Sequence, residues 1–290
     1  MSSVQSSRHS LSQAPLTPES RGRLQQPPET PRYTSTQGVP LPTEIHHLSG
    51  FGSIPEPERS RMMIDRATFV GLRGWKDLEG DPECADTDYY DGYANTDYYL
   101  MTRGDGVVVA SMRLTPVVDI STCLSVNFFS CDAQRDRASA TINRLLEDKT
   151  ILDLTRLIPN VDMFANVSSQ PAVKSGFIGI LGTAVASAVK HNTFHPTRPI
   201  VWVFTVDGLV RNFLEQEMMI PNLSEVLTHT QSTESTLLDQ MHLMHVDPVV
   251  GTAGIVEDGK SPHASMLSAY SGIGYKSVDL RKAPPVAALD

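Results

Sequence analysis

Two neighbouring apolar segments leave few ways for this chain to fold. Residues 174–191 have the composition of a helix, and the apolar stretch within them, Phe177 to Val189, is too short to span a bilayer. Residues 200–206 (IVWVFTV) are rich in β-branched and aromatic side chains, which favour a strand. A buried helix that is followed by a buried strand predicts an α/β fold.

The segments on either side of this pair support the same interpretation. Residues 98–101 and 107–112 predict two strands that are joined by a Gly-Asp-Gly turn, which makes a β-hairpin. Residues 150–157 (TILDLTRL) alternate apolar and polar side chains, as a half-buried strand does. Helices are expected over residues 62–75, 132–149 and 209–218, and residues 124–129 suit a short helix or a strand. This order predicts an α/β sandwich around a mixed sheet.

The two ends of the chain differ in composition from its middle. Residues 1–58 are rich in Ser, Gln, Pro and Thr, and we expect a disordered tail with order beginning near Pro57. A single domain is expected over residues 59–222. Residues 223–290 are expected to form a C-terminal extension that is partly irregular, with a short helix over residues 237–244.

Charge and cysteine content exclude several classes of partner. The net charge of −9 argues against nucleic acid as the main partner, because phosphate binding needs a basic face. The three cysteines, Cys84, Cys123 and Cys131, are an odd and sparse set that fits a reducing cytosol. They include no C-x-x-C pair, which argues against a cysteine-based zinc site, and no metal site is expected. The N-terminus has no apolar core typical of a secretory signal. We therefore expect a soluble, cytoplasmic protein that does not contact the membrane.

Charged side chains of opposite sign recur in the middle of the chain. An acidic loop contains Asp86, Asp88 and Asp91, and Arg113 ends the second hairpin strand. Taken alone, acidic loops and arginine–aspartate pairs are more often solvated surface or structural ion pairs.

Asp153 and Arg156 lie together on the strand TILDLTRL. Positions three apart on a strand point to opposite faces, so these two side chains diverge unless a bulge re-aims one of them.

The order of these residues resembles the acyl-homoserine-lactone synthase family over roughly residues 60 to 220. In that family, a helix with Arg and Phe precedes Gly-Trp, an acidic loop, a strand that ends in an Arg-Leu-x-Pro turn, and a strand with Glu-x-Ser-Arg. The matching positions here are Arg66, Phe69, Trp75, Asp86, Asp88, Asp91, Arg113, Asp153 and Arg156. Asp153 and Asp86 stand where the family has Glu, Thr155 stands where it has Ser, and Arg66 lies one residue closer to Phe69 than the family pattern has it.

The resemblance implies a two-step reaction. The amine of S-adenosylmethionine, a substrate and not a resident cofactor, attacks an acyl thioester, and its carboxylate then closes the lactone and expels methylthioadenosine. Asp153 is implied as the base, acting directly or through a water, with Arg113 and Arg156 as further catalytic residues. The residues implied to bind S-adenosylmethionine are Arg66, Phe69, Trp75, Asp88 and Asp91.

The resemblance also implies a fold. The synthases are similar to the GCN5-related acetyltransferases, so we expect a three-layer sandwich whose mixed central sheet is split in a V between the strands at 150–157 and 200–206. The acyl donor is expected to be acyl carrier protein or acyl-CoA, with backbone N–H groups after Asp153 meeting the thioester oxyanion. The acyl chain is expected to contact Phe128, Phe129, Trp202 and Phe204.

Two other functions stay open from the sequence. One is an N-acetyltransferase that uses acetyl-CoA, although the Q/R-x-x-G-x-G/A loop that cradles pyrophosphate is absent after the Asp153 strand. The other is a non-catalytic homologue that binds an acyl carrier or a small ligand.

Overall fold

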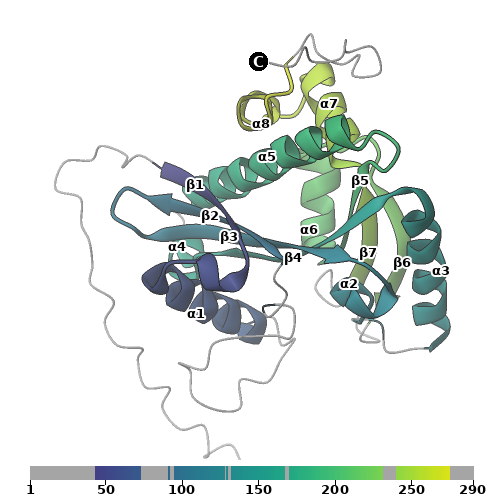
Figure 1. The fold of residues 1–290 in the computed structure, drawn as a ribbon. Helices are drawn as coiled ribbons and strands as arrows, with labels where there is room; N and C mark the ends of the chain where they lie inside the picture. The colour runs from purple at the N-terminus through teal and green to yellow at the C-terminus, as the bar shows by residue number, and fades with distance from the viewer. Residues whose placement is uncertain are drawn as a thin grey trace, which may run out of the picture. The chain divides into compact units, whose positions relative to one another are not determined.

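A mixed β-sheet forms the middle layer of the protein in its computed structural model (Figure 1). The structure describes residues 43–72, 91, 95–127, 129, 132–166, 170–230 and 240–274, all of which fall in one unit. The strands in this part of the chain are β1 (Thr43–Ser49), β2 (Asp97–Arg103), β3 (Val108–Val117), β4 (Thr150–Pro159), β5 (Ile200–Asp207), β6 (Ser224–Thr230) and β7 (Gln240–Val246).

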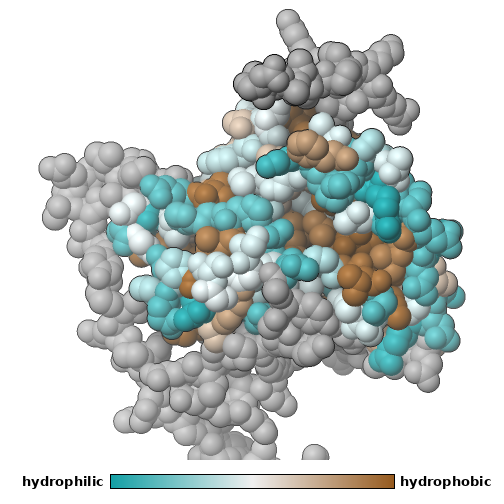
Figure 2. Space-filling view, in the orientation of Figure 1, coloured by the Kyte–Doolittle hydropathy of each residue, from teal (hydrophilic) through white to brown (hydrophobic). Residues whose placement is uncertain are grey.

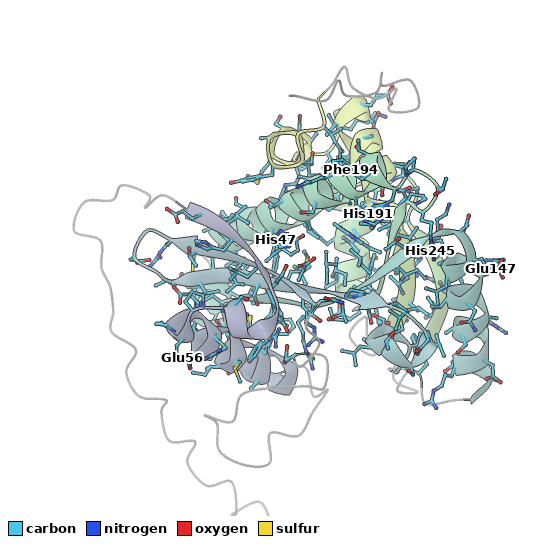
Figure 3. The ribbon with its side chains drawn as sticks, viewed as in Figure 1. His47, Glu56, Glu147, His191, Phe194 and His245 are labelled. Carbon is cyan, nitrogen blue, oxygen red and sulfur yellow. The ribbon has the colours of Figure 1, made fainter. Side chains whose placement is uncertain are left out.

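Helices cover both faces of this sheet, which makes the three layers that were predicted. The helices in the described ranges are α1 (Glu56–Leu72), α2 (Leu124–Asn127), α3 (Asp132–Asp148), α4 (Val161–Ala165), α5 (Gln170–Phe194), α6 (Gly208–Asn212), α7 (Pro248–Asp258) and α8 (Ala264–Ser271). Figure 3 labels Glu56 at the start of α1 and Phe194 at the end of α5, and these two helices lie on opposite sides of the sheet.

The strand order is β1-β2-β3-β4-β5-β7-β6. Only the β4–β5 pair among these strands is parallel, and the other neighbours are antiparallel. β4 needs a long crossover to reach a parallel neighbour, and α4 and α5 supply it. The predicted α/β fold with a mixed sheet is confirmed.

Three hydrophobic clusters hold the layers together, and one of them packs Met62 of α1 against Tyr98, Leu100 and Val108 of the hairpin. On one face, α3 packs on β4, β5 and β7 through Ile142, Ile151, Val203 and Leu243. On the opposite face, α5, α7 and α8 pack on the sheet through the largest cluster, which includes Trp202. Figure 2 shows apolar surface gathered right of centre, below α5 and to the left of α3.

α5 is the most apolar helix of the described chain. By length and composition alone its 25 residues are sufficient to cross a membrane, but more than half of its most apolar stretch is buried inside the protein. α5 packs closely against α8 at Gly182. A Cβ at this position would lie 2.7 Å from Cβ of Tyr270, so a larger residue would not fit without a shift. The position of α5 between the sheet and α8 is that of a core helix.

The predicted central elements are confirmed. The hairpin, the strand TILDLTRL, the long helix and the strand IVWVFTV appear as β2–β3, β4, α5 and β5. The helix expected at 62–75 begins earlier, at Glu56, where Glu56 and Glu58 favour a helix N-terminus. The helix expected at 209–218 is α6 followed by the π-helix Phe213–Glu217.

Both predicted boundaries of the domain are wrong for the described residues. β1 lies inside the segment expected to be a disordered tail, because Ile45 and its neighbours pair along the whole length of β2. The segment expected to be partly irregular contains β6, β7, α7 and α8, and β7 is an inner strand between β5 and β6. The helix expected at 237–244 is wrong, because residues from Gln240 onward pair with β5 on one side and β6 on the other.

Candidate active site

The sheet splits between its two central strands. β4 and β5 pair only from Thr150↔Ile200 to Asp153↔Val203. Beyond that point β4 stays paired with β3 as far as Pro159, and β5 stays paired with β7 as far as Asp207. After Asp153, β4 and β5 are therefore no longer ladder partners. This is the V-shaped gap that the sequence predicted.

A β-bulge in β4 lies beside this gap. Ser111 of β3 faces Ile158 and Arg113 faces Thr155, so β4 has one more residue than β3 between these two pairs. Arg156 lies in this extra segment with a φ of 55°, a left-handed conformation that is uncommon for a residue with a side chain. The sequence required such a bulge if Asp153 and Arg156 were to serve one site.

A buried carboxylate joins α1 to the hairpin. Asp91 accepts hydrogen bonds from the Tyr98 hydroxyl at 2.6 Å and from Arg113 Nη1 at 3.0 Å. Arg66 Nη1 lies 3.1 Å from both oxygens of the same carboxylate. Arg113 also donates from Nε to Thr155 Oγ1 on β4 at 3.0 Å. α1, β2, β3 and β4 are thus tied together by one polar cluster.

This cluster is deeply buried, with Arg66 and Arg113 at 0% exposure. Burial lowers the pKa of Arg66, while the charge of Asp91 opposes that shift and Arg113 and Arg156 add to it. Burial and the hydrogen bond to Asp91 raise the pKa of Tyr98 well above its ordinary value, so its hydroxyl stays protonated and donates. Charges held this firmly in a low-dielectric setting interact strongly with a charged ligand.

A second carboxylate, Asp153, lies on the same face of the sheet as Thr155, because the two residues are two positions apart on β4. Ser125 of α2 donates to it twice, from Oγ to Oδ1 at 2.5 Å and from its backbone N–H to Oδ2 at 2.9 Å. Asp153 is fully buried. Burial raises its pKa above the ordinary aspartate value, and the hydrogen bonds from Ser125 and the charge of Arg113 reduce that rise.

A cavity of about 350 Å³ extends along the split. Its wall includes Phe69 of α1 together with Thr155 and Arg156 of β4 on the α1 side. It also includes Trp202 and Phe204, whose side chains belong to the cluster on the opposite face. Because the lining comes from both faces, we infer that the cavity passes between the two strands. Its far wall is formed by apolar residues of α5, α7 and α8, among them Leu181, Val185, Ile255 and Leu267.

The structure brings most of the described candidate residues to this region. Arg66 and Arg113 both donate to Asp91, and the residues that line the cavity are Phe69, Arg156, Trp202 and Phe204. Asp153 lies behind Ser125 and is absent from the cavity lining. Trp75, Asp86, Asp88 and Phe128 lie outside the described residues.

The structure corrects the expectation for Phe129. Its side chain packs with Val126, Ala138 and Ile142 in the cluster between α3 and the sheet, and it is not part of the cavity lining. Burial in that cluster accounts for the position of the ring.

Three side chains at the site were not predicted. Tyr98 was detectable, because the hairpin register places it opposite Arg113. Ser125 and Thr205 gave no local signal, since their link to each other and to Asp153 arises from tertiary contacts. Within the described part of the chain, no group of three His, Cys, Asp or Glu side chains is arranged to hold a metal ion.

The chain is similar in structure to TofI and to FeeM. A structure of TofI in a ternary complex with an inhibitor and MTA has 14% identity and a TM-score of 0.43, with 74% of this chain and 96% of that chain covered. FeeM, an N-acyl amino acid synthase from uncultured soil microbes, has 9% identity and a TM-score of 0.46, with 78% and 97% covered.

An acetyltransferase of the GNAT family from Streptococcus pneumoniae has 9% identity and a TM-score of 0.33, with 70% of this chain and 98% of that chain covered. No protein-family model matches the sequence. No curated protein matches it either.

Proposed function

We propose that this protein is an acyltransferase that makes an N-acyl-homoserine lactone, a quorum-sensing signal. Its substrates are S-adenosylmethionine and an acyl thioester of acyl carrier protein or coenzyme A. The observation that carries the proposal is the cavity along the split between β4 and β5. Its lining is mostly apolar but includes Arg156 and Thr155, and Thr155 bonds to the buried cluster of Arg66, Asp91 and Arg113 behind it.

The cavity suits an acyl chain. An apolar cavity of about 150 Å³ accepts the six carbons of benzene, so a cavity of about 350 Å³ has room for roughly fourteen carbon-sized atoms. Part of that space lies in the split itself and is assigned to the thioester. The remainder fits a medium-length chain of roughly eight to twelve carbons, by the same scale.

The charged cluster suits S-adenosylmethionine. Its carboxylate pairs with a guanidinium, for which Arg66, Arg113 and Arg156 are candidates. Its sulfonium and ammonium groups suit a carboxylate such as Asp91 and an aromatic ring such as Phe69. Trp75 and Asp88 are also proposed to bind S-adenosylmethionine.

The reaction follows from this placement. The neutral amine attacks the thioester carbon, a C–N bond forms, the C–S bond breaks, and the thiol leaves. Backbone N–H groups of β4 past Asp153 stabilise the oxyanion in between. A carboxylate oxygen then attacks the γ-carbon, forming a C–O bond as the C–S⁺ bond breaks, and methylthioadenosine leaves with the electron pair.

The alternative of an acetyltransferase that uses acetyl-CoA fits less well. An acetyl group has two carbons, and the cavity extends to α7 and α8, far more space than such a group fills. A non-catalytic binding homologue is the third outcome of the test below.

The test is product analysis with purified protein. S-adenosylmethionine and acyl thioesters of 2 to 14 carbons, on acyl carrier protein and on coenzyme A, are followed by mass spectrometry. We expect acyl-homoserine lactone, methylthioadenosine and free thiol in equal amounts. Release of the thiol with transfer of the acyl group to another amine, and without methylthioadenosine, identifies an acetyltransferase. No product at all identifies a binding protein.

A pair of variants separates the site from the rest of the surface. Arg113→Ala removes a buried guanidinium of the cluster and should abolish lactone production. Arg103→Ala removes a partly exposed arginine of β2 whose partner is Asp105, and activity should stay within about threefold. Thermal melts check that both variants fold. Normal turnover by folded Arg113→Ala removes this residue from the site.

A further inference from the structure

Ser125 occupies the position between Asp153 and the cavity. It lines the cavity wall, whereas the Asp153 carboxylate behind it does not. Its hydroxyl hydrogen points at Asp153 Oδ1 over 2.5 Å, which is the length of a strong hydrogen bond to a charged acceptor. Any proton that passes from the cavity to Asp153 along this line crosses the Ser125 hydroxyl.

Both sides of the split hold Ser125 in place. The backbone N–H of Ser125 donates to Asp153 of β4 at 2.9 Å, and its carbonyl oxygen accepts from the Thr205 hydroxyl of β5 at 2.8 Å. Asp153 is the last β4 residue paired with β5, so Ser125 bridges the strands where they part. A side chain fixed to both strands has a defined position relative to anything bound between them.

We propose that Ser125 is a catalytic residue that carries the proton of the attacking amine to Asp153. The inference rests on the proposed function. As the amine nitrogen loses its proton to Ser125 Oγ, the hydroxyl proton of Ser125 moves to Asp153 Oδ1, and the hydroxyl is regenerated. The neutral nitrogen then forms the C–N bond. No oxidant or further reactant is needed, and the proton leaves Asp153 after the thiol has departed.

A purely structural role makes a different prediction. Asp153 also accepts hydrogen bonds at the first turn of α2, so it serves as a cap for that short helix. If capping were the whole role of the pair, Asp153→Asn would keep an acceptor oxygen and most of the activity. If Ser125 instead relays a proton to Asp153, Asp153→Asn loses the carboxylate that receives the proton, and activity falls.

The decisive comparison is Ser125→Thr with Ser125→Val. These two side chains have nearly the same shape, and they differ in the hydroxyl. We expect kcat for Ser125→Val to be about 100-fold or more below kcat for Ser125→Thr, the usual size of a general acid–base contribution. KM for S-adenosylmethionine should differ little between them. Ser139→Ala, on the exposed face of α3, serves as the control and should match the unmodified protein.

The pH profile gives a second readout. Activity needs ionised Asp153, so kcat/KM should rise with pH through a pKa above the ordinary aspartate value of about 3.9. The Ser125 hydroxyl lowers that pKa, so in Ser125→Ala the acidic limb should move to higher pH. Ser139→Ala should leave it in place.

Equal activity of Ser125→Thr and Ser125→Val overturns the relay, as does an Asp153→Asn variant that keeps most of its activity. These results are distinct from failure of the proposed function. If the unmodified protein releases no methylthioadenosine, the synthase proposal fails; if it does and the two Ser125 variants are equal, only the relay fails.

Discussion

Asp91 pairs with two buried guanidinium groups, those of Arg66 and Arg113. Arg66 and Arg113 come from elements far apart in sequence, so this carboxylate also holds α1 against the hairpin. The family resemblance predicted that these three residues meet. It could not predict Ser125, which lies 28 residues from Asp153 in a segment without a recognisable motif. Contacts of this kind depend on the packing of α2 and leave no local pattern in the sequence.

Replacing Asp91 with Asn should destabilise the protein strongly. The substitution removes a negative charge between two buried cations, and breaking such a buried pair costs about 3–5 kcal/mol of unfolding free energy. Urea unfolding measures the loss. Asp148→Asn, which breaks an exposed pair with Lys149, should cost about 1 kcal/mol or less. Similar values for the two variants contradict a central role for Asp91.

The bulge in β4 distinguishes the strand that contributes Thr155 and Arg156 to the cavity wall. It gives β4 an extra residue opposite β3, and Arg156 takes a left-handed conformation within it. The sequence indicated that a bulge was required, but it could not locate one. The register of β4 is set by its pairing with β3 over many residues and not by the sequence TILDLTRL alone.

Arg156→Gly should separate stability from activity. Glycine adopts a positive φ without strain, which relieves roughly 1 kcal/mol, whereas the guanidinium that lines the cavity is lost. We expect a melting temperature that is unchanged or higher, and kcat/KM at least about tenfold lower. Arg198→Gly, beyond the helix end and away from the cavity, is the control for activity. Full activity in Arg156→Gly would show that the side chain takes no part in the reaction.

At the scale of the whole molecule, the cavity is completed by the last third of the described chain. α7 and α8 supply its far wall, although the sequence suggested a partly irregular extension there. Short apolar segments such as QMHLMHV fit a helix or a strand equally well by pattern. This segment forms the strand β7 because it pairs with β5 on one side and with β6 on the other.

Filling the far end of the cavity should change the preferred acyl chain. Thr252→Phe adds bulk at a buried lining position of α7, and each methylene that loses its apolar contact costs about 0.8 kcal/mol, or roughly fourfold in kcat/KM. We expect an order-of-magnitude loss with the longest accepted thioester and little change with short ones. Val250→Phe, on the exposed side of α7, should keep the original preference. An equal loss at every chain length would place the acyl group elsewhere.

The position of β7 also determines when the protein can fold as it is made. β6 leaves the ribosome before β7, yet its pairing partner in the sheet is β7, which also pairs with β5. Until residues 240–246 emerge, a nascent chain therefore carries one strand without a neighbour and a second with an open edge. Because α7 and α8 follow later still, the wall of the cavity is complete only when nearly all of the described chain has been synthesised.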